Sequence, residues 1–215
     1  MKDILNPEKN FIENGKFKLQ MKGIFFCDKS DEKQIFQTTL GQHLWERDDR
    51  DFVISVGKNG EDKTEIKIHK LILASRSPVF DAMLKAEMKE KVENRIEIVD
   101  FGVEIVEAAV DFFYDQESYV MLDLDNLIGL LQFADKYDVK DLKRKIENQL
   151  FDLLHPTNIC QIVNASIISN SQMLKDICLS SMIVFHCQKV LIENLEILDK
   201  DFAFELVQKS FSSVI

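Results

Sequence analysis

Hydrophobic and polar positions alternate one by one along four short stretches in the first hundred residues. This period of two predicts β-strands over 16–22, 52–56, 65–69 and 95–99. Residues 57–60, Gly-Lys-Asn-Gly, provide a turn between the second and third stretches, which therefore predict a hairpin. Because a lone strand cannot bury its apolar face, the stretch at 16–22 either joins a sheet elsewhere or is the last strand of a domain whose remainder is absent.

Apolar side chains spaced three and four residues apart predict helices in the rest of the chain. Phe36, Leu40 and Leu44 form a short stripe, which either packs on its own domain or serves as a partner helix or dimer interface. From residue 123 onward, successive amphipathic segments with short links predict antiparallel neighbouring helices. Residues suited to helix N-termini precede these segments: Ser77 with Pro78, Asp100, Asp123, Asp138, Thr157 and Ser171. The pattern predicts an α+β fold that is predominantly helical.

Composition and charge narrow the class of protein. The 215 residues include only 7 Gly and 3 Pro, which disfavours turn-rich all-β and low-complexity classes. A net charge of −10 argues against nucleic acid or an anionic membrane as a partner. The four cysteines form no Cys-x-x-Cys pair, so neither a disulfide framework nor a zinc site is expected. We expect a protein of the nucleus or cytoplasm that needs no cofactor or metal.

Motifs for catalysis do not occur in the sequence. It has no Gly-x-Ser-x-Gly elbow, no phosphate-binding glycine loop and no pair of histidines four residues apart. His69, at the end of a predicted strand, is better explained as a structural histidine than as a general base, because no motif places a nucleophile beside it. A non-catalytic protein is the expectation.

Several motifs in a fixed order resemble the BTB/POZ domain, in the form carried by the MATH–BTB family of speckle-type POZ protein. They are DFVISV at 51–56, HKLILASRSPVF at 69–80, EMKE at 87–90, NRIEI at 94–98, FFY at 112–114 and FADKYDVKDLK at 133–143. The resemblance implies a BTB/POZ fold, a small β-sheet flanked by helices, over residues 33–150. It also implies a 3-box and partial BACK helical region over 151–215, and a remnant of a MATH domain over 1–32.

The resemblance also implies contact residues. Domains of this family dimerise through their first helix, which would place Phe36, Leu40 and Leu44 at a two-fold interface. Asp51 and Lys70 match a charged pair near that interface; a pair that only orients the core is an equal alternative.

A second set of residues corresponds to the family's contacts with cullin-3. Met88 and Glu90 match its hydrophobic–x–glutamate motif, although a helix-terminal Met and a solvated Glu are the plainer alternative. Asp135 and Tyr137 are weaker candidates beside that surface. Ile159 either extends the cullin groove or packs on the preceding helices.

The function expected from the resemblance is that of a substrate adaptor. The chain would dimerise with itself or another BTB protein and hold an unknown protein substrate beside a cullin-3 RING ubiquitin ligase. The alternative is a dimerisation module that regulates MATH–BTB adaptors, or a transcriptional co-regulator, without a substrate of its own.

Overall fold

The computed structural model describes residues 12–13, 16–17, 38–57, 63–85 and 92–212. The chain divides into two units, residues 1–37 and 38–215. In the first unit, β1 (Ile12–Glu13) pairs antiparallel with β2 (Lys16–Phe17). The strand predicted over 16–22 is thus seen at its first two residues, and its remainder lies outside the described residues.

The second unit begins with a three-stranded sheet in the order β4-β3-β5. Strand β3 (Phe52–Val56) pairs antiparallel with β4 (Thr64–Ile68), Phe52 opposite Ile68, which confirms the predicted hairpin. It pairs in parallel with β5 (Arg95–Ile98), Ile54 opposite Ile96. The apolar residues at alternate positions of β3 are at most 2% exposed, so the period of two does reflect a buried face.

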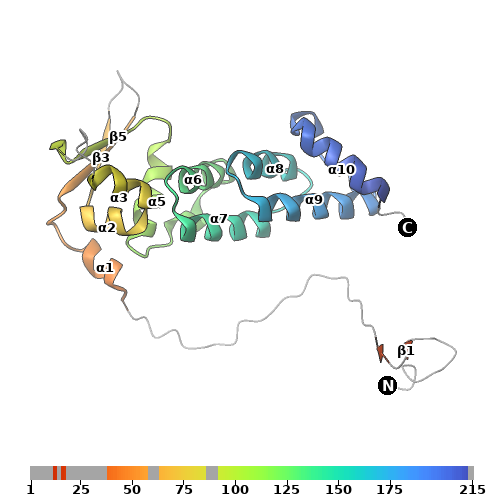
Figure 1. Ribbon diagram of the computed structural model, residues 1–215, viewed down its shortest axis with the longest axis horizontal. Helices are drawn as coiled ribbons and strands as arrows, with labels where there is room; N and C mark the ends of the chain where they lie inside the picture. Colours follow the sequence, from red (N-terminus) through yellow and green to blue (C-terminus); the bar gives the residue numbers. More distant parts are fainter. Residues whose placement is uncertain (1–11, 14–15, 18–37, 58–62, 86–91, 213–215) are drawn as a thin grey trace. The chain divides into compact units, whose positions relative to one another are not determined.

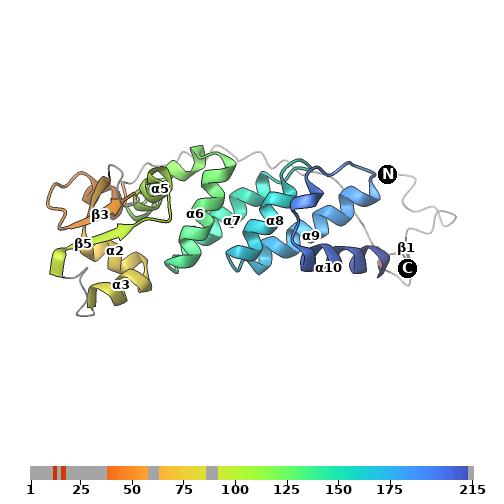
Figure 2. The same ribbon diagram turned by 90° about the horizontal axis from the view of Figure 1, so that it is seen from above.

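Helices surround this sheet and continue beyond it (Figures 1 and 2). Those near the sheet are α1 (Leu40–Trp45), α2 (Lys70–Arg76), α3 (Pro78–Lys85) and α5 (Val103–Phe113), followed by the short 3-10 helix η2 (Ser118–Met121). The tail contains α6 (Leu124–Lys136), α7 (Lys140–Asp152), α8 (Ile159–Ile168), α9 (Gln172–Cys187), the 3-10 helix η3 (Leu195–Ile197) and α10 (Lys200–Ser212). Figure 2 shows these tail helices following one another away from the sheet, each packed on its neighbours.

The N-terminal ends of the helices agree with the sequence in some places and correct it in others. Ser77 caps α3: its hydroxyl accepts the Phe80 N–H at 3.1 Å and donates to the Tyr137 carbonyl at 2.6 Å. Asp123 caps α6 by accepting the Asn126 N–H at 2.9 Å. Ser171 occupies the N-cap of α9 as predicted, but its hydroxyl bonds to Glu147 instead of to the helix.

Three predicted caps are wrong by one or two residues. Helix α5 is preceded by Gly102, and the Asp100 carboxylate pairs with the Lys136 ammonium instead of with the helix. Asp138 adopts a left-handed φ of 50° inside the α6–α7 turn, so Val139 precedes α7. Asn158 precedes α8, while the Thr157 hydroxyl bonds to the His155 ring at 3.0 Å. Each displaced residue has a competing polar partner or turn conformation that the local sequence does not reveal.

Candidate functional site

Helix α1 presents an apolar residue to solvent at the edge of the sheet-bearing half. Leu40 is 74% exposed, whereas Leu44 and Trp45 are partly buried and pack against the core. The helix starts with a capping box, in which the Thr39 hydroxyl accepts the Gln42 N–H at 3.1 Å and the Gln42 side chain accepts the Thr39 N–H at 3.0 Å. Phe36, the first residue of the predicted stripe, lies outside the described residues. Of the two described residues of the stripe, Leu40 is the accessible one, and Leu44 together with Trp45 holds the helix in place.

Helix α1 packs on Tyr114 and Asp115 at the end of α5, and we call these two residues the seat of α1. The Gly41 N–H donates to Asp115 Oδ2 at 3.3 Å, and a Cβ at Gly41 would lie only 2.7 Å from the Tyr114 carbonyl oxygen. The Trp45 ring meets the Tyr114 ring edge to face at 5.1 Å between centroids. Tyr114 is fully buried, and burial raises the pKa of its hydroxyl. Sequence reasoning missed Gly41, Tyr114 and Asp115 as a unit, because their contacts join residues more than seventy positions apart.

Asp51 and Lys70 do come together, although not through their charges. The Asp51 carboxylate accepts the backbone N–H of Lys70 at 2.8 Å, at the first turn of α2, while the Lys70 ammonium contacts the Asn94 side chain. Asp51 directly precedes strand β3, so this hydrogen bond holds the start of α2 close to the start of β3. The predicted part of this pair in a dimer interface stays a prediction.

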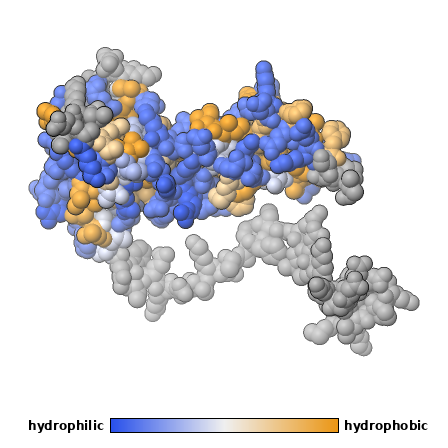
Figure 3. Space-filling model, viewed as in Figure 1, coloured by the Kyte–Doolittle hydropathy of each residue, from blue (hydrophilic) through white to orange (hydrophobic). Residues whose placement is uncertain are grey.

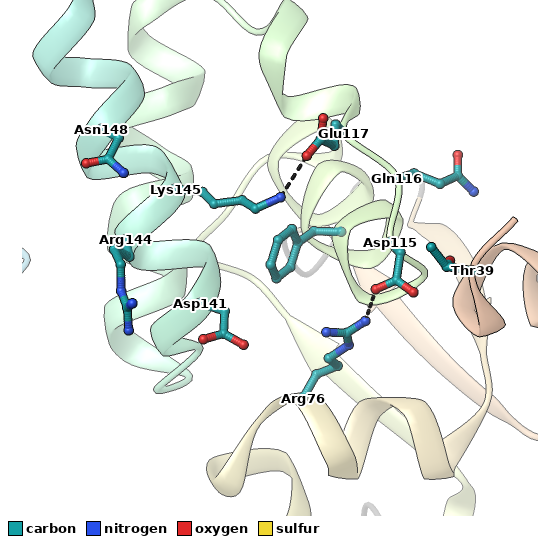
Figure 4. A pocket seen from close by; sticks show the side chains of 10 residues that line it. Thr39, Arg76, Asp115, Gln116, Glu117, Asp141, Arg144, Lys145 and Asn148 are labelled. Carbon is teal, nitrogen blue, oxygen red and sulfur yellow. Dashed lines mark hydrogen bonds and ion pairs between the residues drawn. The ribbon is translucent and has the colours of Figure 1, made fainter. Parts of the chain in front are cut away.

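A polar groove of 590 Å³ lies beside the same seat (Figure 4). Its walls come from the end of α2, the residues after α5 and one face of α7. Two ion pairs cross it: Arg76 with Asp115, and Lys145 with Glu117 at 2.7 Å. Although burial acts in the opposite direction, hydrogen bonds from Thr39 and Arg76 hold the pKa of Asp115 below its usual value. The Arg76–Asp115 pair at one side of the groove also contacts α1, because Asp115 accepts the Gly41 N–H.

The residues predicted to contact cullin-3 separate into three cases. Met88 and Glu90 lie outside the described residues, between α3 and β5. Asp135 is partly exposed and engaged within the chain, accepting from the Lys143 ammonium at 2.6 Å and from the Asn170 amide at 3.0 Å. Its carboxylate therefore ties the end of α6 to α7 and to the α8–α9 turn.

Two of the residues predicted to contact cullin-3 are buried in this structure. Tyr137 is 4% exposed: its ring stacks on Phe80 at 4.4 Å, and burial raises the pKa of its hydroxyl far above the usual value. Ile159 is 0% exposed and belongs to the core. Neither side chain is available to a partner in this structure, so both support the neighbouring surface from inside. The core alternative for Ile159 is the one that the structure favours.

Hydrophobic surface is also present along the helical tail, as Figure 3 shows between hydrophilic regions. Its largest exposed members on and near α10 are Leu191 at 82%, Phe204 at 64% and Phe211 at 79%. Within the described part of the chain, no three His, Cys, Asp or Glu side chains come together as metal ligands. No described helix is both long enough and apolar enough to cross a membrane.

Helix α1 thus places an exposed leucine on a firmly packed α+β core, an arrangement typical of a protein-interaction module. The chain belongs to the BTB/POZ family: the BTB/POZ domain matches residues 40–152, more than half of its length. Domains of this family commonly dimerise and bind other proteins, and they are generally non-catalytic.

Three relatives illustrate the family. The BTB and MATH domain-containing protein 40 of Caenorhabditis elegans is 32% identical over 61% of this chain and 33% of its own length. A BTB/POZ domain-containing protein of Arabidopsis thaliana is 32% identical over 74% of this chain and 61% of its own length. The mouse TD and POZ domain-containing protein 3 is 32% identical over 58% of this chain and 34% of its own length. The chain thus spans from a third to three fifths of these relatives.

Proposed function

We propose that this chain is a non-catalytic adaptor of a cullin-3 RING ubiquitin ligase, that it forms a dimer through α1, and that it acts in the nucleus or cytoplasm. The observation that carries the proposal is the BTB/POZ match over residues 40–152. The chain would supply position alone: a bound substrate protein is held beside the ligase, whose other subunits perform the transfer of ubiquitin.

The dimer contact in this proposal is supported by the geometry of α1. Leu40 exposes 74% of its surface, yet the helix that carries it is fixed by Gly41, Trp45 and the end of α5. A rigid helix with an exposed leucine suits a two-fold contact, in which each copy buries the same side chain.

The cullin contact is supported by the sequence motif and by the rigidity of its frame. Helix α3 precedes Met88 and Glu90 in the sequence, and it is fixed to the α6–α7 turn by the Ser77–Tyr137 hydrogen bond and the Phe80–Tyr137 stack. Helix α3 and the α6–α7 turn thus form one body, as a docking surface for a helical partner requires.

Binding to the purified N-terminal domain of cullin-3, measured by calorimetry, tests the ligase contact. We expect the native chain to bind at micromolar concentration or tighter, and a double variant with Met88→Glu and Glu90→Ala to lose at least about tenfold in affinity, because hot-spot residues typically contribute more than 1 kcal/mol. Met121→Glu, at a 90% exposed position on η2, is the matched control and should bind normally. No binding by the native chain would remove the ligase role and favour the alternative, a dimerisation module acting on other BTB proteins.

The dimer is tested separately by sedimentation of the native chain and the Leu40→Asp variant. Burial of a leucine contributes about 1.5–3 kcal/mol per copy, so the variant should dissociate at least about 100-fold more readily. Met121→Asp again serves as the control for an exposed apolar position. A native chain that sediments as a monomer would exclude the proposed interface.

A further inference from the structure

Three polar side chains from separate segments meet beneath α1. The His69 ring, which directly precedes α2, lies between Tyr114 at the end of α5 and Asp49 in the segment after α1. Its Nδ1 is 2.7 Å from the Tyr114 hydroxyl, and its Nε2 is 3.1 Å from Asp49 Oδ1. The side chain of His69 is 13% exposed, whereas Tyr114 has no exposed surface. The three groups form a chain of hydrogen bonds from the core to the surface.

The hydrogen-bond partners of His69 determine which of its ring nitrogens carries a hydrogen. The Tyr114 oxygen already accepts the backbone N–H of His69 at 3.0 Å, and its own proton needs an acceptor inside the core. An ionised carboxylate can only accept, so the Nε2 that faces Asp49 carries a hydrogen. In the neutral ring, Nδ1 is then unprotonated and accepts the Tyr114 hydroxyl proton. The hydrogen bond to Asp49 and the hydrogen bond to Tyr114 therefore favour the same tautomer of His69, the one that carries its hydrogen on Nε2.

A second proton on the ring would break this arrangement. Proton uptake from water at Nδ1 would turn that nitrogen into a donor and leave the Tyr114 hydroxyl proton without its acceptor. An unmade hydrogen bond of a buried polar group is destabilising. The gain at the other end is small, because Asp49 is exposed and already paired with Arg47 through a hydrogen bond of 2.8 Å.

Most of the charged groups near His69 are engaged with other partners. The Arg50 guanidinium lies 4.5 Å from the Trp45 ring centre and 5.9 Å from that of Tyr114. Asp51 is turned toward the Lys70 N–H and Asp115 toward Gly41 and Arg76, so neither carboxylate bonds to the imidazole. The Lys70 ammonium contacts Asn94. Among the described carboxylates, Asp49 is the one that bonds to the imidazole, and it also accepts from Arg47.

We propose that His69 acts as a proton-sensitive latch for α1: the neutral ring holds Tyr114 in the orientation on which Trp45 packs, and protonation loosens the helix. The ring edge of Tyr114 is the contact that transmits the change, because Trp45 rests on it and Trp45 is the last residue of α1. The latch goes beyond the proposed function, since it concerns how α1 is held within one chain and requires no partner.

The fluorescence of Trp45 provides the test, because it is the only tryptophan in the chain. Its emission and its quenching by acrylamide are followed from about pH 8 to pH 5, where histidines change charge. All measurements use a background chain with two substitutions. His43→Gln removes the histidine on α1 itself, and Leu40→Asp removes the proposed dimer contact. Asp49 and Asp115 stay ionised over this range, because their pKa values are held below the usual value.

We expect Trp45 to become more accessible to acrylamide, by about twofold or more, as the pH falls, while far-UV circular dichroism stays constant. His69→Asn, whose amide oxygen replaces the acceptor Nδ1, should remove the transition, and His155→Gln should leave it unchanged. A flat profile in the background chain, or the same transition in His69→Asn, would overturn the proposal.

A second measurement is independent of Trp45. Proton–nitrogen correlation spectra of the imidazoles at pH 8 should show His69 as the Nε2–H tautomer, and Tyr114→Phe should weaken this preference. A predominant Nδ1–H tautomer of His69 in the chain that carries His43→Gln and Leu40→Asp would contradict the hydrogen-bond scheme. Because the Leu40→Asp background is used throughout, failure of the proposed dimer leaves this result intact.

Discussion

Gly41 shows how one residue decides whether α1 can be seated. A Cβ at this position would stand 2.7 Å from the backbone carbonyl of Tyr114, and backbone atoms cannot move aside as a flexible side chain can. Gly41→Ala should therefore shift α1 away from α5 and lower the free energy of unfolding by about 1–3 kcal/mol, despite the better helix propensity of alanine.

Chemical denaturation with the emission of Trp45 as the signal measures both effects of Gly41→Ala. Gly102→Ala is the matched control, because a Cβ there meets no atom within 4 Å. A Gly41→Ala chain as stable as the control, with the native emission of Trp45, would show that α1 is not held in this position.

Asp115 makes the seat of α1 sensitive to strong acid. Burial raises the pKa of its carboxyl, but hydrogen bonds from Thr39 and Arg76 outweigh burial and leave the pKa below its ordinary value of 3.8. A carboxyl with a depressed pKa contributes stability above its unfolded pKa and loses it as the pH falls through the folded pKa. Asp115→Asn should therefore be less stable than the native chain at pH 7, and the difference should shrink below about pH 4.

Denaturation midpoints of both chains at several pH values check this prediction. Asp123→Asn tests whether the effect is specific to Asp115, since Asp123 caps α6 away from Arg76. A stability difference for Asp115→Asn that stays constant from pH 7 to about pH 2 would contradict the role of its charge.

Local sequence identified single residues only where a neighbour in sequence completes the interaction. The sequence predicts Ser77 and Asp123 as caps, and in the structure each accepts the N–H of the residue three positions ahead. The cluster of Gly41, Tyr114 and Asp115 had no such signal, since its hydrogen bonds and ring contacts depend on chain folding. Tyr137 fell in a family motif, yet its side chain proved to be core, because the motif records position and not exposure.

At the scale of elements, the periodicity of apolar residues predicts whether a segment is a helix or a strand better than it predicts where that segment begins and ends. The hairpin of β3 and β4, the strand β5 and the long tail helices followed from alternation and amphipathic spacing. Helix α2 was not predicted as a separate element, because its seven residues span only two turns and resemble the end of the preceding strand. The predicted strand at 16–22 can be compared with the structure only at Lys16–Phe17.

Helix α10 provides a contrast between two phenylalanines on one element. Phe202 is 1% exposed and lies in the core, with the Lys175 ammonium 5.8 Å from its ring, whereas Phe204 is 64% exposed. Phe202→Ala removes the main apolar anchor of α10 and should cost about 3 kcal/mol or more. Phe204→Ala should change stability by less than about 0.5 kcal/mol, the usual size for surface positions.

Hydrogen exchange followed by mass spectrometry locates the effect of Phe202→Ala. We expect faster exchange in α10 and in the half of α9 against which it packs, with α5 and the sheet unchanged. Equal exchange rates in the Phe202→Ala and Phe204→Ala chains would show that Phe202 does not anchor the helix.

At the scale of the whole molecule, the hydrophobic core runs without a break from the sheet through α9. One buried cluster includes Ile54 of β3, Leu131 of α6 and Met182 of α9. The family resemblance predicts a domain boundary at residue 150, and this boundary stays a prediction; the buried cluster includes residues on both sides of it, such as Leu150 and Ile159. The same holds for function. The family motifs predict a protein-interaction module, but the partner is recognised by surface residues, which the pattern of buried positions does not specify.

The continuous core predicts that the tail opens only together with the rest of the unit, and the cysteines can report this. Cys178 of α9 is 0% exposed, and burial raises the pKa of its thiol to about 12, while Cys187 at the end of the same helix is exposed. In a Cys27→Ser chain, a maleimide reagent should therefore modify Cys187 at least about 1,000-fold faster than Cys178, because Cys178 becomes reactive only when the core opens. Gly41→Ala, though distant in sequence, should then accelerate the labelling of Cys178 about tenfold for each 1.4 kcal/mol of lost stability, if opening is cooperative. Labelling of Cys178 that is unaffected by Gly41→Ala would instead show that the tail unfolds as a separate unit.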